Sequence, residues 1–200
     1  MIVDPQNNEV NQGKPHSLRI WKTLTKTVIL SLNKFLTVES HEILLPDGKI
    51  IPDWAWIISP NVVIVMAMTE ENNFLFFRQT KYAIEDACLA PVGGMMEPDE
   101  EPLDAAKREL LEETGYTATE WVPLGSSVLD PNRGIATINL FLALKIRQTA
   151  CPDVNQKDLE DQELVFLSQK EVREALRAGE IKAIQWISAA AMALNYLSDL

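Results

Sequence analysis

The sequence concentrates acidic side chains in one short segment, GMMEPDEEPLDAAKRELLEETGY, which runs from Gly94 to Tyr116. The segment holds six glutamates and two aspartates but only two basic residues. Glu109, Glu112 and Glu113 stand at positions i, i+3 and i+4, so a helix would place them on one face. Crowded carboxylates repel each other, whereas a hard divalent cation such as Mg²⁺ takes several oxygen ligands together with water and phosphate. The spacing indicates a metal site; the alternative is the solvated acidic face that most charge runs form.

A helix over residues 103–114 must position these acids. Pro102 suits the first turn of this helix, and Gly115 suits its C-terminal stop. Apolar residues at i, i+3 and i+7 from Leu103 form a neighbouring face, which we expect to pack on the core. Arg108 stands one turn before Glu112, where a guanidinium can hold acidic groups through a forked contact.

The loop before this helix contains Gly93 and Gly94. Glycine allows the backbone to approach a metal ion or a phosphate closely. Glu100 lies in the same loop, and we expect it to tie the loop to the helix.

The rest of the chain reads as a mixture of strands and helices. Alternating and β-branched residues predict strands over much of 21–58, with a turn at Pro46-Asp47-Gly48, and again at 61–68, 74–79, 137–146 and 163–167. Two further helices are predicted at 170–179 and 184–197. Strands and helices do not alternate as regular βαβ units, so the predicted fold is an α/β sandwich around a mixed sheet.

Composition narrows the class of partner. The net charge of −11 argues against nucleic acid or an anionic membrane surface, because both are bound through lysine and arginine. Cys88 and Cys151 are far apart and lack a metal-type spacing, which is typical of reduced thiols in a cytoplasmic protein. No apolar run approaches the ~18 residues of a membrane span. Residues 1–16 are polar, and we expect them to be a poorly ordered tail.

The order Gly94, Glu100, Arg108-Glu109-Leu110, Glu112-Glu113 and Gly115-Tyr116 matches every position of the Nudix box, so the chain resembles a Nudix hydrolase. The resemblance implies an α/β/α sandwich that hydrolyses a nucleoside diphosphate linked to a moiety X, with Mg²⁺ or Mn²⁺ as cofactor. It also implies that Arg108 orients the acids and that Glu112 and Glu113 act in catalysis. The metal ligands that it implies are Glu109, Glu112, Glu113, the carbonyl of Gly93 and Glu100.

The flanks of the box resemble the ADP-ribose pyrophosphatase branch of the family. The similar segments are RQTKY at 78–82, the Ala90-Pro91 approach to the box, Pro131, DQELVFL at 161–167 and the closing segment 179–194. By this resemblance Glu163 is a candidate general base or extra metal ligand, carried on a loop opposite the box, with Glu160 and Asp161 as neighbours that could take the role. The alternative for Glu163 is a solvent-facing acid at the start of a strand. Leu89, where the branch usually has an acid, is a departure.

Aromatic and basic residues supply the candidate substrate contacts. In this branch N-terminal aromatic residues stack the adenine, which makes Trp21, Trp54 and Trp56 candidates, and their alternative is core packing. Alternation along a strand puts Trp54 and Trp56 on one face. The candidate partners of the phosphates or the terminal ribose are Arg78, Lys81 and Arg133. His16 and His41 have no metal-like partner nearby and are expected to be surface groups.

These observations predict an enzyme that cleaves ADP-ribose or an ADP-sugar to AMP and a sugar phosphate. The alternatives are another Nudix pyrophosphatase, acting on NADH, a nucleotide sugar, a dinucleoside polyphosphate or a damaged triphosphate, and a non-catalytic module that senses ADP-ribose. The domain organisation expected is an N-terminal β extension at 17–58, which could serve as a dimer element, and a Nudix domain at 59–200. The expected assembly is a homodimer.

Overall fold

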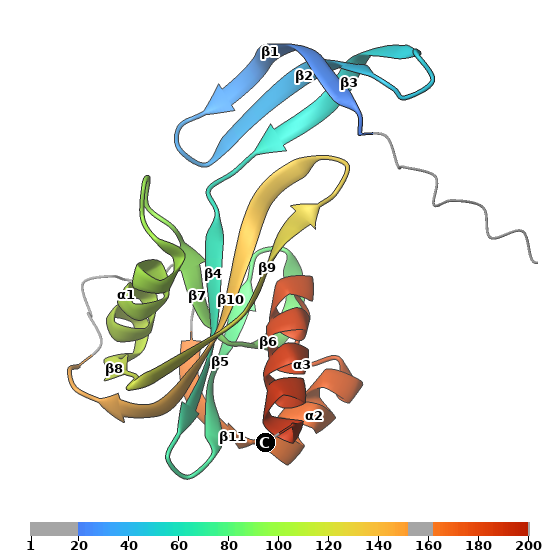
Figure 1. Cartoon of the computed structure of the whole chain (residues 1–200). Coiled ribbons are helices and arrows are strands. Elements are labelled where there is room, and N and C mark those ends of the chain that lie inside the picture. The colour runs from blue at the N-terminus through green and yellow to red at the C-terminus, as the bar shows by residue number, and fades with distance from the viewer. Residues whose placement is uncertain (1–19, 152–161, 200) are drawn as a thin grey trace, which may run out of the picture.

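The computed structural model describes residues 20–151 and 162–199. Within these residues eleven strands form one curled sheet, and three helices cover its faces (Figure 1). The strands are β1 (Lys22–Leu32), β2 (Leu36–Leu44), β3 (Ile50–Ile58), β4 (Val62–Thr69), β5 (Asn73–Lys81), β6 (Ile84–Ala90), β7 (Val92–Met95), β8 (Tyr116–Thr117), β9 (Glu120–Asp130), β10 (Gly134–Gln148) and β11 (Gln162–Ser168). The helices are α1 (Pro102–Thr114), α2 (Gln169–Ala178) and α3 (Ile184–Ser198).

The tail predicted at residues 1–16, with His16, lies outside the described residues, and so do Glu160 and Asp161. None of the helices in the described part of the chain combines the length and the apolar character needed to cross a lipid bilayer.

The sheet is mixed, as the sequence predicts. Its strand order is β1-β2-β3-β10-β4-β5-β11. Strand β10 runs parallel to β3 and to β4, whereas the pairs β1–β2, β2–β3, β4–β5 and β5–β11 are antiparallel. Strand β7 adds to β4 as a further antiparallel neighbour and carries the backbone directly into the loop before α1.

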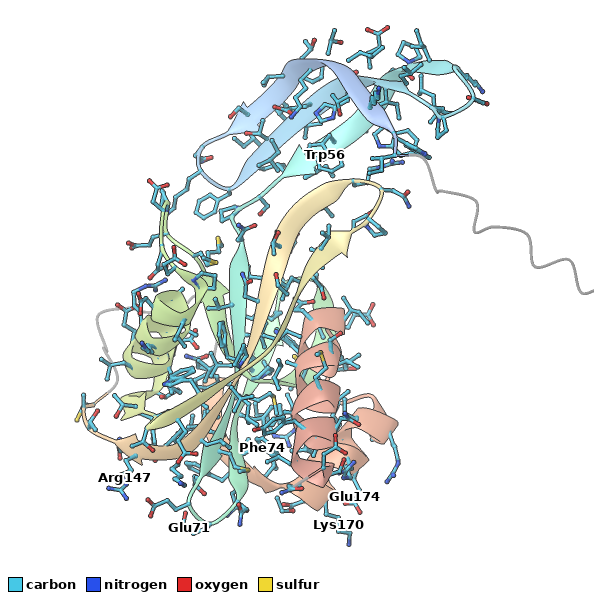
Figure 2. All side chains as sticks on the ribbon, in the orientation of Figure 1. Trp56, Glu71, Phe74, Arg147, Lys170 and Glu174 are labelled. Atoms are coloured by element: carbon cyan, nitrogen blue, oxygen red, sulfur yellow. The ribbon has the colours of Figure 1, made fainter. Side chains whose placement is uncertain are left out.

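Alternation along β4 divides the core into two layers. Val63 and Val65 face α1, where they pack with other fully buried side chains that include Leu110. Ile64 and Met66 face α2 and α3 on the other side. Figure 2 shows Phe74 of β5 within this second layer, between the sheet and α3. The predicted α/β/α sandwich is confirmed.

Strands β1 to β3 extend beyond the sandwich as an antiparallel sheet of their own (Figure 1). This N-terminal sheet joins the main sheet through a short parallel pairing of Ile57 and Ile58 with Gly134 and Ile135. Every residue of β1 is exposed, although the strand carries several large apolar side chains. The junction brings the β1–β2 turn, residues 34–37, close to the loop that precedes α1, residues 93–100, so that both line one pocket.

Candidate active site

Helix α1 begins and ends where its sequence predicts. Pro102 occupies the first turn, and Gly115 closes the helix with φ 74°, a left-handed conformation that favours glycine. The Gly115 N–H donates to the carbonyl of Leu111 at 2.8 Å. Ala105, Ala106 and Leu110 are fully buried against the sheet. This packing fixes the rotation of the helix and turns its acidic face toward the loop that follows β7.

Arg108 uses all of its N–H donors inside the protein. A guanidinium has five N–H groups in a fixed plane. Nε and Nη2 donate to the two oxygens of Glu100 at 2.8 and 2.9 Å. Nη1 donates to Glu109 at 2.7 Å and to Glu112 at 3.2 Å, and Nη2 also donates to the carbonyl of Met95 at 3.2 Å. Arg108 therefore holds three acids and the loop together, and it has no N–H left for a substrate.

Glu109 is the most deeply placed of the acids, with 9% of its surface exposed. Burial raises the pKa of Glu109, while the neighbouring Arg108 acts in the opposite direction. The carboxylate lies so close to Gly94 that a Cβ at that position would come within 2.3 Å of its Cδ and Oε2. Gly94 is thus required for the space that this carboxylate occupies, and a bound cation would relieve the cost of burying its charge.

The two remaining glutamates of the helix differ in their surroundings. Glu113 lines the pocket next to the helix and accepts a hydrogen bond from the Gly93 N–H at 3.3 Å. The Glu112 side chain is 33% exposed, bonds Arg108 and does not line this pocket. In the loop, Glu100 also accepts from the Glu97 N–H at 2.8 Å, and the hydrogen bond from Arg108 lowers the pKa of Glu100. Glu100 therefore ties the loop to the helix, as predicted.

An open pocket of about 1230 Å³ lies in front of these acids. Its walls come from the β1–β2 turn (34–37), the β3–β4 connection (58–61) and the loop 93–100. Its floor contains Arg108, Glu109 and Glu113, and Lys81 stands at its side. We call it the acidic pocket.

The acidic pocket has the donor set of a hard-cation site but not its final arrangement. Its acids and the nearby backbone offer only oxygen ligands, which suit Mg²⁺ or Mn²⁺. Among the described residues, no three aspartate, glutamate, histidine or cysteine side chains converge on one preformed cation position. The carboxylates of Glu109 and Glu112 turn toward Arg108, and that of Glu113 turns toward Gly93. The residues fit a divalent cation once the carboxylates rotate toward it.

Two predicted site residues lie on the other side of the sheet. Glu163 lies on strand β11 rather than on a loop, and it pairs with Arg78 of β5. Val165, two residues along β11, packs in the α2–α3 layer, so Glu163 faces that layer and not α1. Arg78 faces the same way and pairs with Glu180 at 3.8 Å. The structure therefore corrects the placement of Glu163 opposite the box and separates Arg78 from the acidic pocket.

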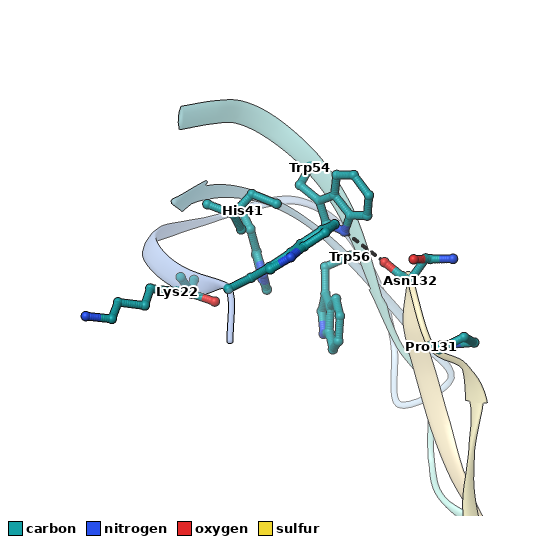
Figure 3. Close-up of a pocket in the computed structure, with 9 residues that line it drawn as sticks. Lys22, His41, Trp54, Trp56, Pro131 and Asn132 are labelled. Carbon is teal, nitrogen blue, oxygen red and sulfur yellow. Dashed lines mark hydrogen bonds between the residues drawn. The ribbon is translucent and has the colours of Figure 1, made fainter. Parts of the chain in front are cut away.

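A second pocket, of about 130 Å³, lies under the N-terminal sheet (Figure 3). Trp21, Trp54 and Trp56 all line it, so the two strand tryptophans share a face as predicted. Trp54 donates from Nε1 to the carbonyl of Asn132 at 2.8 Å, and the Arg133 guanidinium lies 4.9 Å from its ring centroid. Trp21 meets Trp54 edge-on, at 5.4 Å and 85°. We call this the aromatic pocket.

The aromatic pocket contains a buried histidine that sequence reasoning had assigned to the surface. His41 is only 4% exposed and stacks on Trp56 with centroids 5.4 Å apart and planes 19° apart. Its Nε2 lies 2.7 Å from a carboxylate oxygen of Glu39. Trp56 also packs tightly on Gly134, where a Cβ would approach it to 2.4 Å. The available signal was the i, i+2 spacing of Glu39 and His41, which puts both on one face of a strand.

The two pockets lie along the same face of the β2–β3 pair. His41 pairs with Trp54 at the aromatic pocket, whereas Thr37 pairs with Ile58 at the edge of the acidic pocket. Four residues separate the two positions, which corresponds to roughly 13 Å along a strand. A single extended nucleotide is of this order of length, so one ligand could contact both pockets.

Comparisons with known proteins agree with this geometry. A model of the NUDIX domain matches residues 59–199. The chain is 27% identical over 176 residues to the ADP-ribose pyrophosphatase of Bacillus subtilis (strain 168), covering 88% of this chain and 91% of that protein. It is 28% identical, with the same coverage, to the methanol dehydrogenase activator of Bacillus methanolicus. A crystal structure of an ADP compounds hydrolase has the same fold, with a TM-score of 0.75, 18% identity, and coverage of 92% of this chain and 97% of the other.

Proposed function

Because this chain belongs to the NUDIX-domain family and is a Nudix hydrolase, we propose that its substrate is a nucleoside diphosphate linked to a sugar, with ADP-ribose first. In this reaction water adds across the P–O–P bridge, and the products are AMP and ribose 5-phosphate. The single observation that carries the proposal is the cluster of acids around Arg108 on the floor of the acidic pocket. The relative from Bacillus subtilis, named as an ADP-ribose pyrophosphatase, supports this choice of substrate.

We propose Mg²⁺ or Mn²⁺ as the cofactor. Glu109 and Glu113 line the pocket and would be its principal ligands, with Glu112, Glu100 and the carbonyl of Gly93 as further oxygen donors. When bound, such an ion supplies neutralisation of charge on the phosphate oxygens and a water of lowered pKa. Arg108 is assigned the task of positioning these acids, because its donors are all engaged by them and by the loop.

Proton acceptance from the attacking water is assigned to an acid of α1. Glu113 faces the pocket, and Glu112 is the partly exposed carboxylate one residue before it. Glu163 is not given this role, since its strand turns it toward the α2–α3 layer. A pair of substitutions separates these assignments. Glu163→Gln is expected to keep turnover within about 3-fold of that of the parent enzyme. Replacement of a proposed metal ligand by its amide, as in Glu113→Gln, is expected to lower turnover by about 10²-fold.

Substrate binding divides between the two pockets. Lys81, together with Lys34 of the β1–β2 turn, supplies the positive charge of the acidic pocket that Arg108 cannot offer, and we assign both to the phosphates or the terminal ribose. Trp21, which is 48% exposed, is assigned the stacking of adenine. Trp54 and Trp56 are assigned to the walls beside the adenine, because Arg133 already covers the ring of Trp54 and His41 already covers the ring of Trp56.

The proposal is tested by a panel of ADP-ribose, ADP-glucose, NADH, diadenosine polyphosphates and nucleoside triphosphates, each with Mg²⁺ or Mn²⁺. We expect AMP and ribose 5-phosphate from ADP-ribose with the highest kcat/KM, and loss of turnover when EDTA is added. If a nucleoside triphosphate or NADH has a kcat/KM at least tenfold higher than that of ADP-ribose, ADP-ribose is rejected as the substrate, while the assignment as a Nudix hydrolase stands.

We also propose that residues 17–58 form a dimer element and that the enzyme is a homodimer. Strand β1 is an edge strand that exposes Val28, Ile29 and Leu30 side by side. A long, apolar, unpaired edge is a template for another chain, and a second copy would cover it. Sedimentation at micromolar concentration is expected to give twice the chain mass of 22.5 kDa, and a monomeric value would contradict the proposal. We place the reaction in the cytoplasm, where Cys88 and Cys151 stay as the free thiols observed.

A further inference from the structure

His41 is a buried polar residue that has no role in the proposed hydrolysis. It lies in the aromatic pocket, well away from the acids of α1, and it is 4% exposed. A histidine buried among tryptophans must satisfy its ring nitrogens, because an unpaired polar atom in such a place is costly. The described residues offer the imidazole one hydrogen-bond partner, the Glu39 carboxylate at 2.7 Å from Nε2.

Glu39 fixes which nitrogen carries the proton. An ionised carboxylate can only accept hydrogen bonds, so Nε2 is the protonated nitrogen and donates to it. In the neutral ring the other nitrogen, Nδ1, then keeps a lone pair and is an acceptor. No side-chain nitrogen or oxygen in the described residues is both sealed from solvent and unpaired, so Nδ1 keeps some access to solvent, and His41 lines the aromatic pocket.

The stack on Trp56 fixes the plane of the imidazole, and the Glu39 contact anchors its Nε2. The imidazole lies nearly parallel to the indole at 19°, and Trp56 is itself held against Gly134. Both residues line the pocket beside Trp21, whose exposed ring is the proposed stacking surface. Figure 3 shows His41 and Trp56 in the same pocket, so a flat base that stacks on Trp21 would lie beside an imidazole whose ring plane is held.

We propose that His41 reads the base edge and selects a purine that carries an amino group at C6, as adenine does. An acceptor at Nδ1 pairs with an amino hydrogen. The 6-oxo group of hypoxanthine or guanine would instead set an oxygen lone pair against the nitrogen lone pair, leaving both acceptors unsatisfied. This inference deepens the proposed function, on which it rests for the assignment of the base to the aromatic pocket.

The test measures equilibrium binding of AMP, IMP and GMP by tryptophan fluorescence, and it needs no turnover. The loss of one hydrogen bond and the desolvation of two acceptors predict about 10- to 100-fold weaker binding of IMP than of AMP to the parent protein. His41→Phe keeps the stack on Trp56 but removes the acceptor, so AMP and IMP should then bind within about 3-fold of each other. Equal binding of AMP and IMP to the parent protein, or discrimination that survives in His41→Phe, overturns the proposal.

A second variant decides the question if His41→Phe does not fold. Glu39→Gln keeps the shape of the pair, but its amide can donate to Nε2 and so permits the opposite tautomer, with Nδ1 as a donor. Preference for AMP should fall to within about 3-fold, and unchanged preference counts against the tautomer argument. Lys49→Met, in the exposed β2–β3 turn, is the matched control and should keep the preference of the parent protein. Discrimination between AMP and IMP without hydrolysis of ADP-ribose would reject the proposed function alone.

Discussion

Replacement of Gly94 by alanine tests whether the acids of α1 work as a positioned unit. The added Cβ would lie 2.3 Å from the Glu109 carboxylate, whereas ordinary contacts begin near 3.4 Å, so the carboxylate must retreat by about 1 Å. Gly94 does not have positive φ, so alanine brings no backbone strain. A displacement of about 1 Å in a catalytic array costs on the order of 10²-fold in rate. We expect Gly94→Ala to lower kcat/KM for ADP-ribose by about that factor.

The assay combines steady-state release of AMP with calorimetric titration of Mn²⁺. Affinity for Mn²⁺ should fall by about 10- to 100-fold, as when a residue that supports a metal ligand is changed. The thermal midpoint should move by only a few degrees, because the contact is with the flexible end of a side chain. The decisive control is a double-mutant cycle: once Glu109 is alanine, Gly94→Ala should cost less than about 3-fold more. Additive losses in the cycle, or unchanged Mn²⁺ affinity in the single variant, would refute the reasoning.

Three further variants probe the same cluster. Glu113→Gln should lower turnover by at least about 10²-fold with the fold intact by circular dichroism, and near-normal turnover would contradict its role as a ligand. Arg108→Lys offers three donors in place of five, so we expect about 10-fold lower kcat/KM and a lower melting temperature; parent-like values would show that the forked contact is dispensable. Arg108 lowers the pKa of Glu100, so the stability that Glu100 supplies is present above its unfolded pKa of about 4.3 and is lost as pH falls through the lowered folded value. In Glu100→Gln, the free energy of unfolding measured with urea should therefore fall less steeply between about pH 5 and 3 than in the parent protein. An unchanged pH dependence would show that the Arg108–Glu100 ion pair does not cause the loss of stability in acid.

Local signals in the sequence predicted helix α1 and the strand pair β4–β5 well. Pro102 and Gly115 mark the ends of α1 because proline and glycine act on the backbone within one turn. The strand at 61–68 and its hairpin partner at 74–79 are present as β4 and β5, joined across Ala67 and Leu75. These predictions hold because each depends on residues that are close in the chain.

Predictions that depend on contacts between distant residues were less complete. Strands β6 and β9 were missed, since their side chains lack a clean alternation and their place depends on pairing with β5 and β10. Glu163 was expected opposite the box, but the register of β11 against β5 decides its face, and a shift of one residue would reverse it. The burial of His41 was missed because its stacking partner Trp56 becomes a neighbour only when β2 and β3 pair.

The charge balance of the acidic pocket supports an order in which the proposed cation binds before the substrate. Its lining carries five acids, Glu97, Asp99, Glu100, Glu109 and Glu113, against three cations, Lys34, Lys81 and Arg108. Arg108 is fully engaged within the protein, so its N–H donors are not available to an incoming diphosphate, which meets a net excess of negative charge. Two lysines cannot offset that repulsion for a group that is itself anionic. A divalent ion on the proposed ligands Glu109 and Glu113 would reverse the sign of the field at the floor of the pocket, so the same carboxylates would then favour binding of the proposed substrate.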